Sequence, residues 1–380
     1  MGTLIYADNA ATTQLDKDAL EAMLPFLNQE FGNASNQYSF ARFPRKAIEE
    51  ARLIISNCIN ARPDEIFFTS GGTESDNWAI KGIALKTQNK GKQIITSSIE
   101  HHAVLHSCSF LEEIGYKVAY LPVSNQGHAS IDNLREVIGT NTSLVSLMLA
   151  NNEIGTIQNI EELSKIANDR RVLFHSDAVQ AVGHIPIDVN TLGVDLLSAS
   201  AHKFNGPKGV GFLYLRKGTD LLNWSSGGKQ EFGRRSGTEN VAGIVGMAVA
   251  LKKNVDNLRA NEIYLQRLSS LFFEKLTGSG IDFLVNGDNY RRLPGNINIS
   301  IRNQDGEALM HRLDLKGIIV STGSACSSGK LDISHVIKSI GVPREYALGT
   351  IRISIGKDNS IPDVLAIADA ITSIILRGSM

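Results

Sequence analysis

The sequence has few of the features that mark exported, membrane or nucleic-acid-binding proteins. It holds only three cysteines, Cys58, Cys108 and Cys326, too scattered for a disulfide framework or a Cys-x-x-Cys zinc site. No apolar run is long enough to span a bilayer, and residues 1–6 lack a signal-peptide pattern. With 38 basic and 39 acidic residues, bulk charge attracts the chain to neither nucleic acid nor an anionic membrane. We therefore expect a cytoplasmic protein in which any important cysteine is a single reactive thiol.

The length of 380 residues exceeds one ordinary core and predicts a large domain with a smaller one. Short apolar runs alternate with helical spacing through the first two thirds, which favours an α/β fold with a mostly parallel, doubly wound sheet. The expected strands are 66–69, 93–97, 117–121, 144–149, 172–176, 196–200 and 210–215. The expected helices are 17–26, 42–59, 74–86, 103–114, 131–138 and 160–167. Functional residues are then expected at the carboxyl ends of the strands.

A long helical pattern over residues 241–276 predicts a connector to a small α+β layer. Its strands are expected near 283–285, 296–301, 318–321 and 350–355, after a short first strand at 4–7. We predict a large domain over residues 16–254 and a small domain made of 1–15 and 255–380.

Lys203 lies on a short turn between two apolar runs, in the stretch from Ser198 to Gly211. Partial removal from water disfavours the ammonium form, and a free amine is what a Schiff base with a carbonyl cofactor requires. Ser200 and His202 beside it can donate hydrogen bonds to a phosphate. The alternative is a surface lysine in a glycine-rich hairpin.

The motif Thr69-Ser70-Gly71-Gly72-Thr73-Glu74-Ser75 follows an expected strand and opens an expected helix. Backbone amides at such a helix start attract an anion, and the Thr73 hydroxyl adds a donor. A plain turn is the alternative, and the strand-to-helix placement favours the anion site.

Three histidines, His101, His102 and His106, follow the strand at 93–97. His102 and His106 share a helix face, which suggests a metal site. No carboxylate stands in the zincin spacing, so we favour His101 as an aromatic face stacked on a planar cofactor.

Two further strand ends carry polar side chains. Asn152 follows one strand as a neutral donor for a substrate carboxylate, or as a turn residue. Asp177 follows another and can hold a pyridinium nitrogen protonated, with Gln180 three residues later; a helix cap is the alternative.

The last two candidates lie near the carboxyl terminus. Cys326 stands among small, flexible residues in Ser321-Thr322-Gly323-Ser324-Ala325-Cys326, a setting that suits an exposed nucleophilic thiol. Arg352 alternates with apolar strand residues, so it is placed for bidentate carboxylate recognition unless it is a surface arginine. The glycine-rich stretch 227–238 is long enough to act as a binding loop.

Taken in their order along the chain, the motifs resemble those of the cysteine desulfurases, which are fold-type I pyridoxal phosphate enzymes of the class V aminotransferase group. The resemblance runs from Tyr6-Ala7-Asp8-Asn9-Ala10-Ala11-Thr12-Thr13 to the last helix. The cysteine motif is similar to the Ser-x-Gly-Ser-Ala-Cys of the long-loop NifS/IscS branch. It is unlike the Arg-x-Gly-His-His-Cys-Ala of the short-loop SufS branch.

The resemblance implies a pyridoxal 5′-phosphate site. Lys203 would form the Schiff base and later move protons, and His101 would stack on the ring. Asp177 would pair with the ring nitrogen and Gln180 with the phenolic oxygen. The implied phosphate ligands are Gly72, Thr73, Ser200, His202 and, from the partner subunit of a homodimer, Thr238.

For the substrate, the resemblance implies that Asn152 and Arg352 hold the carboxylate of L-cysteine. Cys326 would attack the substrate sulfur, leaving alanine and a persulfide on itself. The persulfide would pass to a sulfur-acceptor protein in iron-sulfur cluster assembly, tRNA thiolation or DNA phosphorothioation.

The chain departs from the family pattern in two motifs. The usual Gly-Asn-Pro-Ser-Ser-x-His is Gly32-Asn33-Ala34-Ser35-Asn36-Gln37-Tyr38, and a common Gly-Gly-Gly is Gly227-Gly228-Lys229. Neither change removes a catalytic group; both bear on the choice of partner.

Three alternatives remain open at this point. A selenocysteine lyase or an aminotransferase would share the cofactor, and an aminotransferase would not need Cys326. A metal-dependent hydrolase would instead use the side chains of His101, His102, His106, His175 and Asp177. A non-enzymatic sulfur carrier or scaffold could retain the fold.

Overall fold

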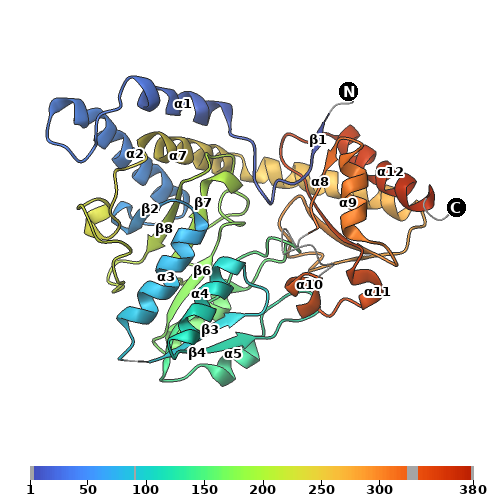
Figure 1. The fold of residues 1–380 in the computed structure, drawn as a ribbon, viewed down its shortest axis with the longest axis horizontal. Helices are drawn as coiled ribbons and strands as arrows, with labels where there is room; N and C mark the ends of the chain where they lie inside the picture. The colour runs from blue at the N-terminus through green and yellow to red at the C-terminus, as the bar shows by residue number, and fades with distance from the viewer. Residues whose placement is uncertain (1–3, 90, 323–332, 378–380) are drawn as a thin grey trace.

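The computed structural model describes residues 4–89, 91–322 and 333–377. Two bodies of secondary structure lie side by side in Figure 1, and helix α8 (Leu258–Thr277) runs from one toward the other. None of the helices in the described part of the chain is long and apolar enough to cross a membrane.

The larger body is built on a seven-stranded sheet in the order β2-β8-β7-β6-β5-β3-β4. Its strands are β2 (Ile66–Thr69), β3 (Gln93–Ser97), β4 (Lys117–Leu121), β5 (Thr142–Ser146), β6 (Leu173–Asp177), β7 (Leu196–Ser200) and β8 (Gly211–Leu215). The pairs from β7 to β4 are parallel, and β8 runs antiparallel to both of its neighbours. The predicted mostly parallel α/β sheet is confirmed.

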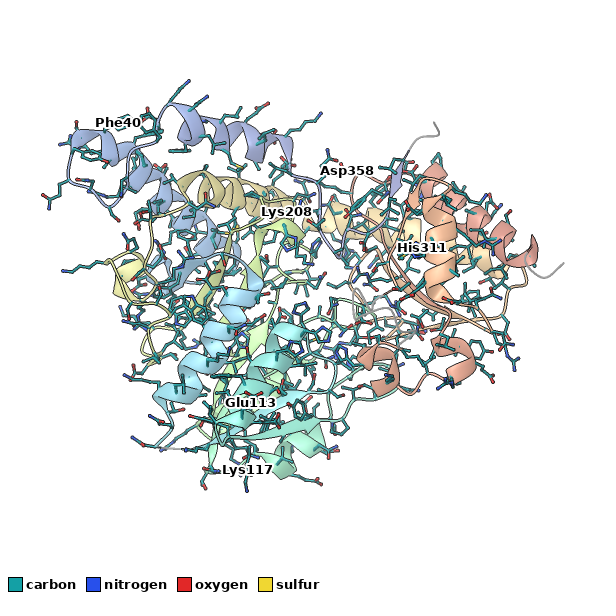
Figure 2. All side chains as sticks on the ribbon, in the orientation of Figure 1. Phe40, Glu113, Lys117, Lys208, His311 and Asp358 are labelled. Atoms are coloured by element: carbon teal, nitrogen blue, oxygen red, sulfur yellow. The ribbon has the colours of Figure 1, made fainter. Side chains whose placement is uncertain are left out.

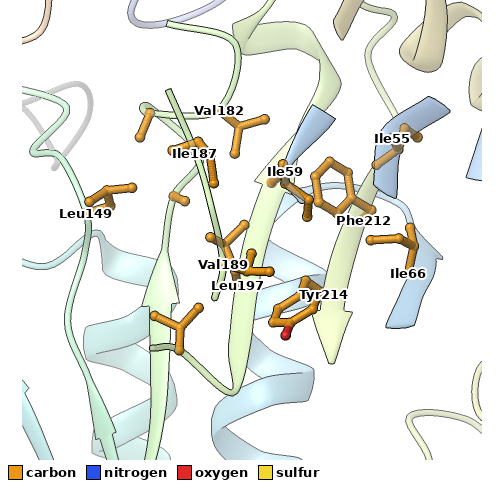
Figure 3. Close-up of a cluster of buried hydrophobic side chains, with 14 of the residues drawn as sticks. Ile55, Ile59, Ile66, Leu149, Val182, Ile187, Val189, Leu197, Phe212 and Tyr214 are labelled. Carbon is orange, nitrogen blue, oxygen red and sulfur yellow. The ribbon is translucent and has the colours of Figure 1, made fainter. Parts of the chain in front are cut away.

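Helices cover both faces of this sheet because its strands are apolar on both sides. One face packs against α2 (Arg42–Cys58), α5 (Ile131–Val137), α6 (Ile160–Asp169) and α7 (Val241–Asp256). The other packs against α3 (Gly72–Lys86) and α4 (His102–Glu113). Figure 3 shows part of the first face, where Ile55 of α2 and Ile59 just after it lie near Phe212 and Tyr214 of β8. Helix α1 (Lys17–Asn28) packs on α7 at the outside.

The smaller body contains an antiparallel sheet of β9 (Phe283–Val285), β10 (Asn296–Ile301) and β12 (Thr350–Ser354), with β10 in the middle. Its core is completed by α8, α9 (Gly306–Asp314) and α12 (Ile361–Arg377). The amino-terminal strand β1 (Ile5–Tyr6) pairs with β11 (Ile318–Ile319), and the short helices are α10 (His335–Ser339) and α11 (Arg344–Ala347). The first and last described elements, β1 and α12, therefore both lie in this body (Figure 1).

The helical pattern expected over residues 241–276 is confirmed, but it is divided into two helices, α7 and α8. Asn257 separates them, with its side-chain amide donating to the carbonyl of Lys253 at 2.8 Å. An asparagine side chain that bonds to nearby backbone competes with helix continuation. The predicted boundary between residues 254 and 255 falls close to this break, and the division into domains stays a prediction.

The strand expected at 144–149 was displaced by a few residues. β5 begins at Thr142, which pairs with Gln93 of β3, and ends at Ser146. Leu147 and Leu149 still donate backbone hydrogen bonds to His175 and Asp177. Because those bonds continue, the chain stays against β6 until it reaches the loop that carries Asn152.

Candidate active site

A cavity of about 940 Å³ lies where the loops after β2, β3, β5, β6 and β7 face residues of the second body. All but two of the predicted site residues line it: Gly72, Thr73, His101, Asn152, Asp177, Gln180, Ser200, His202, Lys203 and Arg352. Thr238 is not part of this lining, and Cys326 lies outside the described residues. The structure therefore gathers motifs that are far apart in sequence, while their individual roles stay predictions.

Lys203 closes a single 3₁₀ turn, Ala201–Lys203, that follows β7. Its Nζ donates to the carbonyl oxygens of Ala10 and Ala11 at 2.6 and 2.8 Å. Burial, followed by repulsion from the Arg352 guanidinium, lowers the pKa of Lys203 to about 8. The amine therefore gives up its proton more easily than an exposed lysine does.

Asp177 is the buried last residue of β6, and the backbone N–H of Val179 donates to its Oδ1 at 2.9 Å. Burial raises the pKa of this carboxyl, because the charged form loses its hydration. A protonated ring nitrogen beside it would compensate that loss. Gln180, also buried, donates from Nε2 to the carbonyl of Ala10 at 2.9 Å.

The start of α3 leaves no room for a side chain. Gly71 precedes the helix with φ of +149°, a conformation that favours glycine. A Cβ on Gly72 would lie only 2.5 Å from the Val179 side chain, whereas one on Gly71 would lie at an ordinary contact distance of 3.4 Å from Ser200 Oγ, so at Gly71 the backbone conformation alone favours glycine. Backbone amides at this helix start, with Ser200 beside them, form a cradle suited to an anion.

His202 is fixed at the same end of the cavity by a 3.1 Å contact between its Nδ1 and Thr12 Oγ1. Burial, assisted by the positive charges of Lys203 and Lys208, lowers the pKa of His202 to about 4. The imidazole is therefore neutral near pH 7. The cradle, the buried carboxyl and the low-pKa lysine together fit pyridoxal phosphate.

His101 caps α4, and its Nδ1 accepts a hydrogen bond from the backbone N–H of Ala103 at 3.1 Å. Burial lowers the pKa of His101, so the ring is held neutral with its proton on Nε2. That orientation fixes the ring in the cavity wall as a flat surface with one N–H donor.

Arg352 on β12 is buried, and two of its guanidinium nitrogens already donate hydrogen bonds. Its Nη2 donates to Asp8 Oδ1 at 2.7 Å, and its Nη1 donates to the backbone carbonyl of Asn152 at 3.0 Å. Its Nε is buried without a hydrogen-bond partner in the described part of the chain. An oriented guanidinium with an unused N–H suits carboxylate recognition.

The segment that contains Cys326 is flanked by residues of the cavity wall. Before it, Ser321 pairs with Arg352 through backbone hydrogen bonds of 3.0 and 2.6 Å. After it, Ser334 Oγ donates to Glu153 Oε2 at 2.6 Å. Ser321 and Ser334 both line the cavity. Both described flanks therefore lie at the candidate active site.

Sequence reasoning missed several buried carboxyls. Asp76 on α3 lines the cavity, its Oδ1 has no hydrogen-bond partner among the described residues, and burial together with Asp177 raises its pKa well above the usual value. Burial raises the pKa of Glu100 to about 8 and that of Glu153 to about 7. The signal was present for Asp76, because it lies four residues before Ile80 on the apolar stripe of α3.

The histidine arrangement does not favour the metal-hydrolase alternative. His175 is fully buried, with Nδ1 2.8 Å from Ser146 Oγ and Nε2 3.0 Å from Ser198 Oγ. The His102 ring lies tilted against those of His106 and His335, with ring centroids 5.1 Å apart in each case. Among the described residues, no group of three histidine, cysteine, aspartate or glutamate side chains is arranged to hold a metal ion.

Comparison with known proteins adds independent support. Residues 5–367 match the family described as aminotransferase class-V. A cysteine desulfurase IscS of Dictyoglomus turgidum is 51% identical over 98% of this chain and 94% of its own. Another, from Methanosarcina thermophila, is 48% identical over 98% of this chain and 92% of its own.

Solved structures agree in fold. A NifS-like protein superposes with a TM-score of 0.93 at 38% identity, covering 98% of this chain and all of its own. A structure described as SspA in complex with cysteine gives a TM-score of 0.83 at 37% identity, covering 93% of this chain and 99% of its own. These neighbours confirm the expected fold-type I architecture. The chain therefore belongs to the aminotransferase class-V family and, within it, to the cysteine desulfurases.

Proposed function

We propose that this protein is a pyridoxal phosphate-dependent cysteine desulfurase. In the overall reaction L-cysteine and the Cys326 thiol give L-alanine and a Cys326 persulfide, so one C–S bond breaks and one S–S bond forms without an external oxidant. The observation that carries the proposal is the single cavity in which Lys203, Asp177 and Arg352 meet the glycine cradle of α3. The full-length relatives named cysteine desulfurase support the same chemistry.

One group of cavity residues would bind the cofactor, and another would bind the substrate. Bound pyridoxal phosphate supplies an electron sink for charge that develops on the substrate. Asp177 would keep the ring nitrogen protonated, and the start of α3 with Ser200 would hold the phosphate. Lys203 Nζ and His101 Nε2 are the two nitrogens placed to take and return protons.

Arg352, together with Asn152 beside it, would orient the substrate. Asp8 holds the guanidinium from one side through the 2.7 Å contact, so the carboxylate of L-cysteine would meet a preset donor. This places the amino and thiol groups of one small substrate at a fixed distance from the arginine. The substrate thiol would then lie in the cavity whose wall includes both flanks of the Cys326 segment.

The direct test measures products. Purified protein loaded with pyridoxal phosphate and given L-cysteine should form alanine and, with a reductant, an equal amount of sulfide. 3-Mercaptopyruvate in place of alanine and sulfide would indicate an aminotransferase, because transamination leaves the carbon–sulfur bond intact, and turnover of selenocysteine alone would indicate a selenocysteine lyase. Either result would overturn the proposal, and the relatives do not favour either alternative.

We propose that the functional unit is a homodimer. An apolar surface on α1, α2 and the segment between them is formed by Leu20, Leu24, Leu27, Phe31, Phe40 and Phe43, which are 43% to 71% exposed. Phe40 projects at the outer end of these helices in Figure 2, away from the smaller body. Apolar surfaces of this kind are typical of an interface between subunits. The molar mass in solution checks this proposal directly.

We further propose a protein acceptor for the persulfide, in iron-sulfur cluster assembly, tRNA thiolation or DNA phosphorothioation, and a cytoplasmic location. Cys58 and Cys108 are free thiols, as expected in a reducing compartment. Incubation with radiolabelled L-cysteine and candidate acceptors should move the label from Cys326 to the true acceptor. Label that stays on this chain with every acceptor would exclude those three routes.

Capture of pyridoxal phosphate should depend on the protonation of Lys203. Because its pKa is lowered to about 8, about a tenth of the molecules carry a free amine at pH 7, against about 0.03% for an ordinary lysine. The capture rate of cofactor-free protein should rise about fivefold between pH 7 and pH 8 and then level off within about a further twofold. Stopped-flow absorbance from pH 6.5 to 10 measures this. A rate that keeps rising to pH 10 would show that the amine pKa is not lowered.

A further inference from the structure

A buried ion pair anchors the loop of residues 224–239, which we call the anchored loop. Arg52 of α2 binds Glu231 of this loop in a bidentate way, with Nη1 and Nη2 each 2.9 Å from a carboxylate oxygen. The two side chains are only 3% and 5% exposed. Arg52 also donates to the carbonyl of Ile66, at the start of β2. The pair therefore joins the loop to both a helix and the sheet.

The anchored loop adopts a costly backbone conformation at this anchor. Glu231 and Phe232 have φ of 45° and 57°, a region that residues other than glycine seldom occupy. Surrounding contacts hold them there. Glu231 Oε2 accepts a hydrogen bond from the Phe68 backbone at 2.8 Å, and the Arg52 guanidinium lies between the rings of Phe68 and Phe232, 4.5 and 5.1 Å from their centroids.

A second ion pair ties the anchored loop to the phosphate cradle of the same chain. Arg235 Nε and Nη2 donate to the two carboxylate oxygens of Glu74 at 2.8 and 3.2 Å. Glu74 lies in the first turn of α3 and lines the cavity. Within the loop, Ser236 Oγ donates to the carbonyl of Gly228 at 2.9 Å. Two ion pairs thus fix the loop to the rest of the chain, and one internal hydrogen bond braces it, shortly before Thr238.

Thr238 itself is exposed and does not line the cavity of its own chain. A rigidly held loop that presents a hydroxyl away from its own site is organised to serve another molecule. Stability alone explains the anchor poorly, since apolar replacements of a buried ion pair are often as stable. Fixing a loop before binding reduces the entropy that binding must overcome.

We propose that Arg52 and Glu231 are positioning residues that hold the anchored loop so that Thr238 completes the cofactor-phosphate site of a second copy of this chain. The inference rests on the proposed function, because it requires the homodimer and its bound pyridoxal phosphate. Its distinctive consequence is that loss of the ion pair in one chain weakens cofactor binding in the other chain.

Mixed dimers test this consequence. Two differently tagged chains are co-expressed, and Lys203→Ala in one chain leaves a single site with a visible absorption band. In the same-chain arrangement, one chain carries both Arg52→Met and Lys203→Ala, and the other chain is unchanged. The only site with Lys203 is then in the unchanged chain, and the altered chain supplies its Thr238 from a loop without the ion pair. In the separate arrangement, one chain carries Arg52→Met and keeps Lys203, and the other chain carries Lys203→Ala. The site with Lys203 then receives Thr238 from a loop that keeps its ion pair.

The dissociation constant of pyridoxal phosphate should rise on the order of tenfold in the same-chain arrangement and stay within about twofold in the separate arrangement, as expected for one charge-assisted hydrogen bond. An equal effect in both arrangements, or a larger effect in the separate one, would overturn the inference. So would a monomeric wild type. A wild-type dimer with a normal visible band but no alanine formation would instead contradict only the proposed reaction.

Two additional variants control for folding. Arg52→Met/Glu231→Leu removes both charges, so it avoids an unpaired buried charge if Arg52→Met alone does not fold. It is expected to show the same dependence on arrangement. Arg62→Met breaks an exposed ion pair with Asp64 and should leave the dissociation constant unchanged in either arrangement.

Discussion

Replacing Lys203 with alanine is expected to abolish alanine formation from L-cysteine, with a loss of at least about a thousandfold. The Nζ of Lys203 is the only lysine amine among the described residues that combines a pKa lowered to about 8 with a position in the cavity wall beside Asp177. No other described side chain offers the same free amine, so its loss would remove both the proposed bond to the cofactor and a proposed proton carrier.

Absorbance and activity measured on the same samples test this expectation. The variant should lack the visible band that borohydride abolishes in the wild type, although the phosphate site proposed at Thr73, Ser200 and the start of α3 would be unchanged. Lys217→Ala is the matched control, since Lys217 is exposed and pairs with Asp64 away from the cavity. A Lys203→Ala variant that keeps the borohydride-sensitive band would mean that another amine holds the cofactor.

The sheet was predictable because its signals are local. β2, β3, β4 and β7 begin and end at the residues expected for them, and Ser70, Ser98 and Pro122 directly follow the first three. Parallel strands end at one edge, so polar residues placed just after separate strands had to meet there. The positions of Asp177 and Lys203 at two such strand ends therefore predict that they share a cavity, and both line it.

The parts that could not be predicted depend on contacts between distant residues. Asp8 and Arg352 are separated by 344 positions, and Arg52 and Glu231 by 179, so neither ion pair leaves a local pattern. The break at Asn257 was hidden because apolar spacing continues across it on both sides. Asp76 was overlooked because an acidic residue in the second turn of a helix normally suggests exposure.

Replacing Cys326 with serine is expected to remove sulfide release almost completely, by at least about a hundredfold, because a hydroxyl is a poor nucleophile toward sulfur. The other two cysteines cannot substitute for it. Burial raises the pKa of Cys58 to about 11 and that of Cys108 to about 12, so both thiols stay protonated near pH 7. A thiolate is required to attack sulfur, and Cys326 is the remaining cysteine.

The control variants separate this role from folding and from cofactor binding. Cys326→Ser should keep the visible absorption band of bound pyridoxal phosphate, because the cofactor contacts proposed above do not include Cys326. Cys58→Ser should behave as the wild type in both band and activity, since Cys58 lies on α2 against the sheet and outside the cavity lining. Mass spectrometry after L-cysteine should find one added sulfur atom on the wild type and none on Cys326→Ser. Normal alanine formation by Cys326→Ser would assign this site to a reaction that does not transfer sulfur to the enzyme.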